Sequence, residues 1–209
     1  LDWPSTRGLN ETAQKKELLL IFDSLKAAGI NTIIFQVRSE SDAMYPSQIE
    51  PWSFWLTGQQ GLAPSYDPLQ FAIEEAHKRG MEIHAWFNPY RAERAVGNYT
   101  LHPTHVLVEN PSWGLQTGTA KFLDPGLPMV RDYVLSVILD VIKRYDVDGI
   151  HMDDYFYPYP PNPITNQDSS SWRLYNRGFT NIQDWRRDNI NILIKAINDS
   201  THFYKNHIK

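Results

Sequence analysis

Helix-like stretches of this sequence alternate with short apolar runs, and this order is the feature that most constrains the fold. Apolar residues recur with helical spacing over about residues 12–28, 67–80 and 128–145, and again from residue 182 onward. Gly29 and Gly80 provide stop signals for the first two helices. Runs typical of buried strands follow the first three helices, at residues 31–38, 81–87 and 149–153. This alternation predicts an α/β fold built on a parallel sheet.

The connections between these elements differ in length according to their direction. Each step from a helix to the next strand takes a few residues, whereas the segments after Arg38, Phe87 and Asp153 are each about 25 residues or longer. Parallel α/β proteins place functional residues on the loops at the carboxyl ends of their strands. We therefore expect a binding or catalytic site at the carboxyl ends of these three strands.

The length of 209 residues fits a single domain over residues 1–209 but not a closed barrel. An eight-stranded barrel needs about 250 residues and eight strand–helix units. The sequence offers three clear strands and a first one whose end would be Leu1-Asp2-Trp3. It contains no internal repeat and no domain boundary. Two architectures remain open at this point, namely a small open α/β sheet and one part of a larger barrel.

Composition excludes several classes of protein. Acidic residues outnumber basic ones by 24 to 20, so we do not expect a nucleic-acid-binding protein built on a basic surface. Apolar residues make up 42% of the chain, which excludes a disordered acidic tail. No apolar run approaches the roughly 18 residues of a transmembrane segment. The lack of cysteine excludes disulfides, thiolate metal sites and cysteine nucleophiles.

The densest group of polar residues follows the last predicted strand. Strand alternation sends Ile150 and Met152 to one face and His151 and Asp153 to the other. The neighbouring carboxylates of Asp153 and Asp154 are costly to bury unless they are paired, which favours a functional site. The alternative is that one aspartate caps a turn and the other is solvated.

The other two strands also end in polar residues on a single face. For each residue alone the structural interpretation competes with the functional one, since a lone histidine is more often part of a core and an arginine often only pairs with a carboxylate. Their coincidence at three strand ends favours a site. The residues are Gln36 and Arg38, followed by Glu40 and Asp42, on one strand, and His84, Trp86 and Asn88, followed by Arg91, on the next.

Aromatic residues are unusually frequent and occur among these polar residues. The chain has 7 Trp and 11 Tyr, and flat aromatic faces suit stacking on sugar rings. Carboxylates that act on an acetal, together with such faces, are what a glycosidase needs. The aromatic residues near the predicted strand ends are Trp3, Tyr45, Trp52, Trp55, Trp86, Tyr90, Tyr155 and Tyr157.

These motifs resemble those of the glycosyl hydrolase-like 10 family, a group of bacterial envelope proteins with a (β/α)8-barrel catalytic domain. The matching stretches occur in the family's order along the whole chain. They are LDWPS at residues 1–5, QVRSESDAMYPS at 36–47, HAWFNPYR at 84–91, LDPG at 123–126, VDGIHMDDYFYP at 147–158 and DWRRDNIN at 184–191.

The resemblance implies a TIM barrel of which this chain covers about the first four β/α units. It also implies hydrolysis of a glycosidic bond in a bacterial polysaccharide, with peptidoglycan glycan strands stripped of peptide as one substrate class. Family members typically carry export signals or lipoprotein anchors, so the implied location is the periplasm, the envelope or the cell surface. The exposed sheet edges would need the missing half of the barrel, or a second copy, to cover them.

By analogy with related barrel glycosidases, Asp153 is the expected nucleophile or charge stabiliser, and the general acid is expected from a later strand outside this chain. We therefore expect little hydrolysis by the isolated 209 residues. Asp154 would hold Asp153 or bind a sugar hydroxyl, and no cofactor is required. Nearby cations at Arg38 and His84 would keep Asp153 ionised. The expected substrate-binding residues are Asp2, Trp3, Gln36, Arg38, Trp52, His84, Trp86, Asn88, Arg91 and Tyr155.

Two other function classes remain open. A metal-dependent polysaccharide deacetylase could use His84, His151, Asp153 and Asp154 as ligands, although no H-x-x-x-H pair accompanies the aspartates. A non-catalytic carbohydrate-binding domain would need only the aromatic loops. Metal analysis discriminates the first alternative, and an Asp153→Asn variant discriminates the second.

Overall fold

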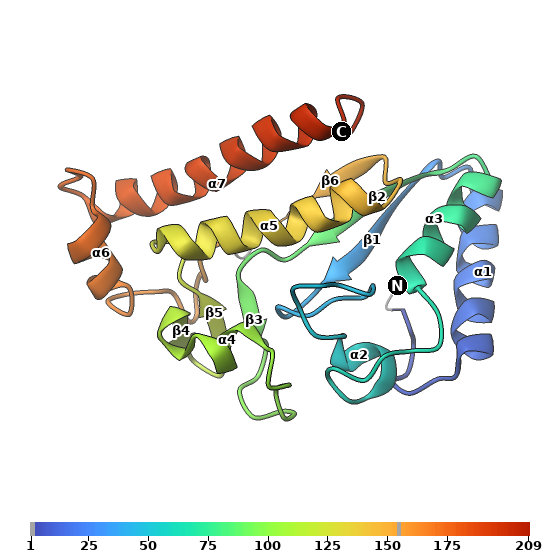
Figure 1. Cartoon of the computed structure of the whole chain (residues 1–209), viewed down its shortest axis with the longest axis horizontal. Coiled ribbons are helices and arrows are strands. Elements are labelled where there is room, and N and C mark those ends of the chain that lie inside the picture. The colour runs from blue at the N-terminus through green and yellow to red at the C-terminus, as the bar shows by residue number, and fades with distance from the viewer. Residues whose placement is uncertain (1–2, 154–155) are drawn as a thin grey trace.

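A computed structural model describes residues 3–153 and 156–209 and shows two small sheets with helices around them (Figure 1). One is a parallel sheet in the spatial order β1, β2, β6, which confirms the α/β prediction. Trp3, at the end of the expected first strand, lies in a bend, and Leu1 and Asp2 lie outside the described residues. The parallel strands are β1 (Thr32–Arg38), β2 (Glu82–Phe87) and β6 (Gly149–His151).

Four long helices occupy the positions that the apolar periodicity predicts. The Asp67 side chain accepts a hydrogen bond from the backbone of Gln70, and Pro68 occupies the first turn of the same helix. Gly29 and Gly80 have φ angles of +81° and +65°, a conformation that costs glycine little. The four helices are α1 (Glu11–Ala27), α3 (Pro68–Lys78), α5 (Pro128–Arg144) and α7 (Ile182–Tyr204).

The helices bury one stripe of side chains each and leave polar residues on their outer sides, as the helices of a globular fold do. Among the described residues, no helix combines the length and the apolar character needed to cross a membrane.

The long segments after the strands contain structure that the sequence does not predict. A second sheet, antiparallel and in the order β3, β5, β4, lies within the segment between β2 and α5. The turn between β4 and β5 begins at Gly118, with a φ angle of +56°. The added elements are β3 (Arg91–Glu93), β4 (Gly114–Thr117), β5 (Ala120–Leu123), α2 (Phe54–Thr57), α4 (Val106–Glu109), η1 (Pro111–Trp113) and α6 (Ser169–Tyr175).

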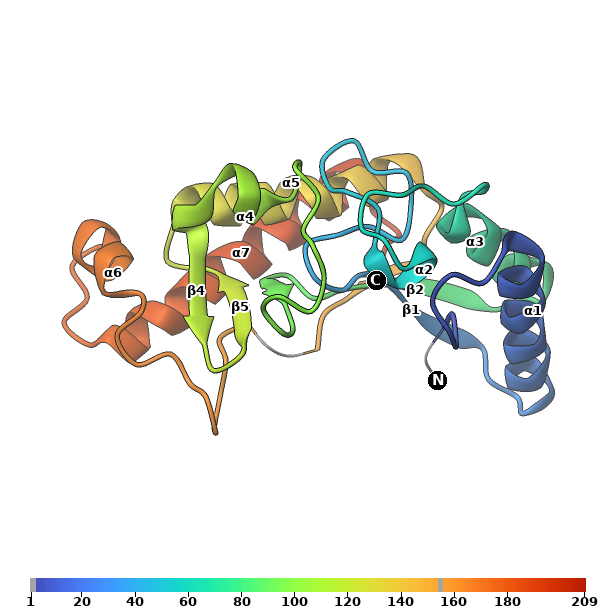
Figure 2. The same cartoon turned by 90° about the horizontal axis from the view of Figure 1, so that it is seen from below.

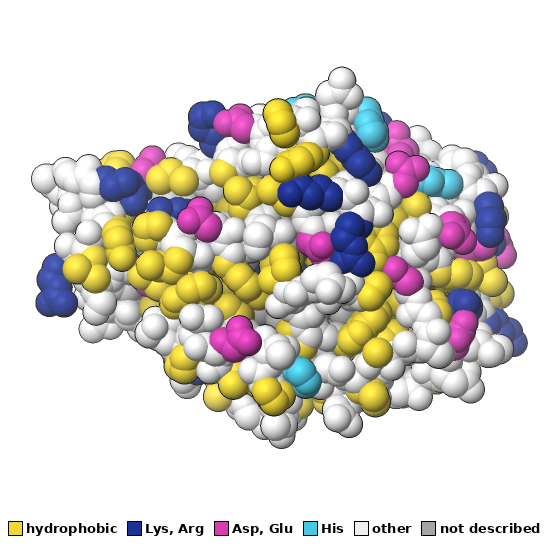
Figure 3. All heavy atoms as spheres, viewed as in Figure 1, with side chains coloured by type: hydrophobic (Ala, Val, Ile, Leu, Met, Phe, Trp, Pro, Cys, Tyr) yellow, Lys and Arg dark blue, Asp and Glu magenta, His cyan; other side chains and the backbone are white. Residues whose placement is uncertain are grey.

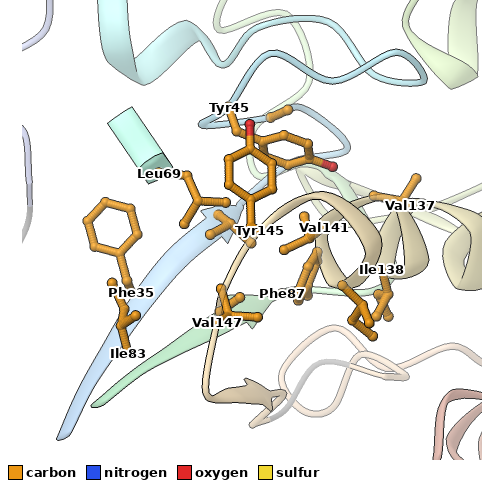
Figure 4. Close-up of a cluster of buried hydrophobic side chains, with 14 of the residues drawn as sticks. Phe35, Tyr45, Leu69, Ile83, Phe87, Val137, Ile138, Val141, Tyr145 and Val147 are labelled. Atoms are coloured by element: carbon orange, nitrogen blue, oxygen red, sulfur yellow. The ribbon is translucent and has the colours of Figure 1, made fainter. Parts of the chain in front are cut away.

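One face of the parallel sheet packs against the helices and forms the core. Figure 4 shows side chains of β1, β2, α3 and α5 that converge there. Because side chains alternate along a strand, every second residue of β1 and β2 enters this core. Each large apolar side chain buried in this way contributes roughly 1.5–3 kcal/mol. The buried strand residues are Ile33, Phe35, Val37, Ile83, Ala85 and Phe87.

The opposite face of the parallel sheet is much less covered. Ile34, in the middle of β1, is 52% exposed, and its neighbours on this face are half-buried. Strand pairing places Ile34 beside His84 and Gln36 beside Trp86. Figure 2 shows the sheet and the second sheet from below, with α5 and α7 behind them. In a closed barrel the less covered face would be the interior.

Candidate functional site

A cleft of about 650 Å³ lies on the open face of the sheet, toward the carboxyl ends of β1 and β2. Cavities of roughly 300 to 1,000 Å³ are typical of ligand sites. Segments far apart in the sequence line the cleft, and they contribute aromatic faces together with a few polar groups. Its principal side chains are Trp3, Gln36, Glu40, Trp55, Trp86 and Arg91.

Asp153 lies just after β6 and is connected to this cleft through Trp86. The indole Nε1 of Trp86 donates a hydrogen bond of 3.0 Å to Asp153 Oδ1. Strand pairing places Trp86 beside His151, the last residue of β6, so the chain that leads to Asp153 starts next to Trp86. The Asp153 side chain is exposed. The geometry therefore presents an oriented carboxylate to solvent next to a wall of the cleft.

The structure brings together part of the predicted set of site residues. Trp3, Gln36, Trp86 and Arg91 line one cleft, and Asp153 bonds to one of them. Asp2, Asp154 and Tyr155, which the sequence also predicts for the site, lie outside the described residues. The predicted residues that do not line the cleft are Arg38, Trp52, His84 and Asn88.

Arg38 does not lie on the face that simple strand alternation predicts. A shift in strand register between Gln36 and Arg38 pairs Arg38 with Phe87, and the Arg38 side chain is completely buried. Its Nε and Nη2 atoms bond to the Glu50 carboxylate at 2.6 to 3.0 Å. This corrects the expectation that Arg38 contacts substrate or keeps Asp153 ionised, because its charge is neutralised by Glu50.

Asn88 and His84 also make contacts that explain their positions without a ligand. Asn88 is buried and its Oδ1 accepts a 2.9 Å hydrogen bond from the backbone of Arg91, which stabilises the turn into β3. The His84 Nε2 lies 3.3 Å from a carboxylate oxygen of Glu82. The His84 ring lies directly over Gly149, since a Cβ there would come within 2.6 Å of it. Trp52 forms an isolated backbone bridge with residue 43.

The cleft also contains residues that strand periodicity does not bring to it. Arg7 and Arg94 line it, and they come from loops whose paths the sequence pattern does not define. Glu40 is buried, and Tyr99 donates a 2.7 Å hydrogen bond to its Oε2. Burial raises the pKa of the Glu40 carboxyl above its ordinary value. Arg94 lies three residues after Arg91, which the sequence does predict for the site, and this proximity is the signal in the sequence that points to Arg94.

A metal site in this chain would need several His, Asp or Glu side chains around one point. Within residues 3–153 and 156–209, no group of three His, Asp or Glu side chains is close enough together to hold a metal ion. His84 and His151 therefore do not form a ligand set with Asp153 among the described side chains. Asp154, which the deacetylase alternative also requires, is not among them.

A family model described as Glycosyl hydrolase-like 10 matches residues 1–209. Glycosyl hydrolase YngK of Bacillus subtilis (strain 168) is 44% identical over 214 residues, which cover 100% of this chain and 41% of that protein. Glycosyl hydrolase DigH of Escherichia coli (strain K12) is 40% identical over 213 residues, which cover 94% of this chain and 48% of that protein. The chain thus spans less than half the length of these two relatives.

Solved structures with a similar fold include two glycosidases. The alpha-L-fucosidase isoenzyme 2 from Paenibacillus thiaminolyticus matches with a TM-score of 0.61 and 16% identity, over 96% of this chain and 29% of that one. The PgaB (BpsB) glycoside hydrolase domain from Bordetella bronchiseptica matches with a TM-score of 0.61 and 14% identity, over 94% of this chain and 58% of that one. At these identities the likeness concerns the fold alone. It confirms the predicted fold class, a (β/α)8 TIM barrel of which this chain contains part.

Proposed function

The chain belongs to the glycosyl hydrolase-like 10 family, and from this membership we propose that it forms part of an enzyme that hydrolyses a glycosidic bond in a bacterial polysaccharide. Glycan strands of peptidoglycan stripped of peptide are one substrate class in this proposal. Such a substrate places the protein outside the cytoplasm, in the periplasm, in the envelope as a lipoprotein or at the cell surface. No nucleic acid and no cofactor takes part.

The observation that carries this proposal is the hydrogen bond from Trp86 to Asp153 at the edge of an aromatic cleft. Glycosidases pass through an oxocarbenium-like transition state, and a carboxylate next to the anomeric carbon stabilises the positive charge that develops there. The indole N–H fixes one carboxylate oxygen, and so reduces the reorganisation that Asp153 undergoes during the reaction. Asp153 therefore acts as nucleophile or charge stabiliser.

The remaining cleft residues bind the sugar in this mechanism. Gln36 offers a donor and an acceptor for hydroxyl groups, and the rings of Trp3 and Trp86 offer faces for pyranose rings. Glycosidases need a second carboxyl group as general acid. We assign that group to a segment of the barrel beyond these 209 residues, and Asp154 to support of Asp153.

Substitution of Asp153 by asparagine tests the proposal in the longest natural chain that contains this segment. We expect turnover of a bacterial glycan to fall by at least about a hundredfold, because the amide cannot stabilise the charge. Glycan binding should persist, since Gln36 and the tryptophans remain. Asp132→Asn, at an exposed position on α5, is the matched control and should leave turnover unchanged.

Unchanged turnover in the Asp153→Asn variant would remove Asp153 from the mechanism. A wild-type chain that binds glycans and hydrolyses none would instead favour the carbohydrate-binding alternative. Loss of activity on removal of a stoichiometric divalent metal would favour the deacetylase alternative.

A further inference from the structure

The cleft concentrates positive charge on a chain that is acidic as a whole. Its described lining residues include the basic side chains of Arg7, Arg91 and Arg94 but only one acidic side chain, that of Glu40. The whole chain has a net charge of −4. On the face of the molecule in Figure 3, acidic and basic side chains are intermixed. The excess of arginine in the cleft is therefore local, and local fields of this kind attract ligands of opposite charge.

Two of these arginines stack on the same tryptophan. The guanidinium carbon of Arg94 lies 4.6 Å from the centre of the Trp55 ring, and that of Arg7 lies 5.4 Å from it. Arg7 also lies 5.0 Å from the ring of Phe54. A guanidinium that stacks on an aromatic face directs its N–H groups outward from the edge of its plane, toward hydrogen-bond acceptors. Trp55 thus contacts both guanidinium groups through its ring and uses none of their N–H groups as hydrogen-bond donors.

The acidic residue of the cleft does not cancel this charge. Glu40 approaches Arg94 at 3.5 Å through the Nε atom of the arginine, and its other oxygen accepts the Tyr99 hydroxyl. The Glu40 side chain is only 3% exposed, whereas that of Arg94 is 60% exposed. Among the described residues, no carboxylate forms an ion pair with Arg7. Both arginine side chains are exposed, so their guanidinium groups are accessible to a ligand in the cleft.

We infer that Arg7 and Arg94, held by Trp55, form a subsite for an anionic substituent on a sugar ring, so that the cleft selects charged over neutral glycans. A carboxylate and a sulfate each present at least two terminal oxygens, which a guanidinium can bind with two parallel hydrogen bonds. The inference rests on the proposed function, since it requires that the cleft receives a glycan. The subsite adds a preference for charged glycans, which neither the fold nor the proposed role of Asp153 implies.

Calorimetric titration with three forms of one β-linked hexosamine oligosaccharide tests the subsite. The forms are neutral, carboxylated and sulfated at the same position, and the protein is the longest natural chain that contains this segment. We expect at least one anionic form to bind about tenfold more tightly than the neutral one, because charge-assisted hydrogen bonds supply that difference. The preference should shrink at high salt, since the subsite is exposed.

An Arg7→Gln, Arg94→Gln double variant should lose this preference while it still binds the neutral form. Arg173→Gln, at an exposed position on α6, is the matched control and should retain it. Equal affinity of the wild-type protein for all three forms would overturn the subsite but leave the proposed function intact. Failure to bind any of them, together with no hydrolysis, would overturn both.

Discussion

The buried ion pair between Arg38 and Glu50 allows the most quantitative prediction. Both side chains are completely buried, and they form a charge-assisted pair with a shortest distance of 2.6 Å. The other end of the guanidinium donates from Nη1 to the backbone oxygens of Asn88 and Pro89, at 2.6 and 3.1 Å. Tyr133 of α5 donates to Glu50 Oε1 at 2.8 Å. The pair thus connects the end of β1, the end of β2 and α5.

Glu50→Gln removes the negative charge but preserves the size of the side chain. It leaves the Arg38 guanidinium buried without a counter-charge, and breaking a buried pair in this way costs about 3–5 kcal/mol. Since a whole domain has a free energy of unfolding of only about 5–15 kcal/mol, the variant should be severely destabilised. Tyr133→Phe removes one hydrogen bond to the same carboxylate and should cost about 1 kcal/mol.

Urea unfolding followed by circular dichroism measures both effects. Glu11→Gln is the control, because Glu11 pairs with Lys15 on the exposed side of α1 and its loss should leave the midpoint almost unchanged. The double variant Arg38→Met, Glu50→Gln should lose less free energy of unfolding than the two single variants lose together. We expect the difference to be about 2 kcal/mol or more. A loss below about 1 kcal/mol in Glu50→Gln, or additive effects in the double variant, would refute the role of the pair.

Two further predictions concern stability. Burial raises the pKa of Asp124 to about 6 from an ordinary value of 3.8, because the buried site favours the uncharged carboxyl group. The contribution of Asp124 to the free energy of unfolding is therefore greatest below pH 3.8 and is lost as the pH rises through 6. On the order of 2–3 kcal/mol of unfolding free energy should disappear between pH 4 and pH 7, and Asp124→Asn should reduce that loss when unfolding is measured across this range. Gly149→Ala should push the His84 ring away and cost about 1–3 kcal/mol, because the added Cβ would lie 2.6 Å from it. Denaturation together with the NMR shifts of His84 checks this, and an unshifted ring would contradict it.

Elements governed by short-range signals could be predicted from the sequence. The Asp67-Pro68 start of α3 and the glycine stops at Gly29 and Gly80 depend on backbone groups a few residues away, and all of them are present in the structure. The three parallel strands were likewise predicted from their apolar, β-branched runs, because burial on the helix side demands such residues.

The second sheet could not be predicted in the same way. Its strands have only three or four residues, which is too short for alternation to be recognised. Pairing between β3 and β5 joins residues such as Arg91 and Phe122, and the intervening chain contains little periodicity. Gly118 at the turn between β4 and β5 was the available signal, since glycine favours the first position of a tight hairpin turn.

The register shift near the end of β1 determines which polar residues are available to a ligand. Without it, strict alternation would put Gln36 and Arg38 on the same face, beside the cleft. With it, Gln36 stays on the open face next to Trp86, whereas Arg38 turns toward the core and pairs with Glu50. The guanidinium then holds the backbone of Asn88 and Pro89, immediately after the strand that carries Trp86. Arg38 is consequently a positioning residue, and two cations of the cleft, Arg7 and Arg94, come from loops that strand alternation does not reach.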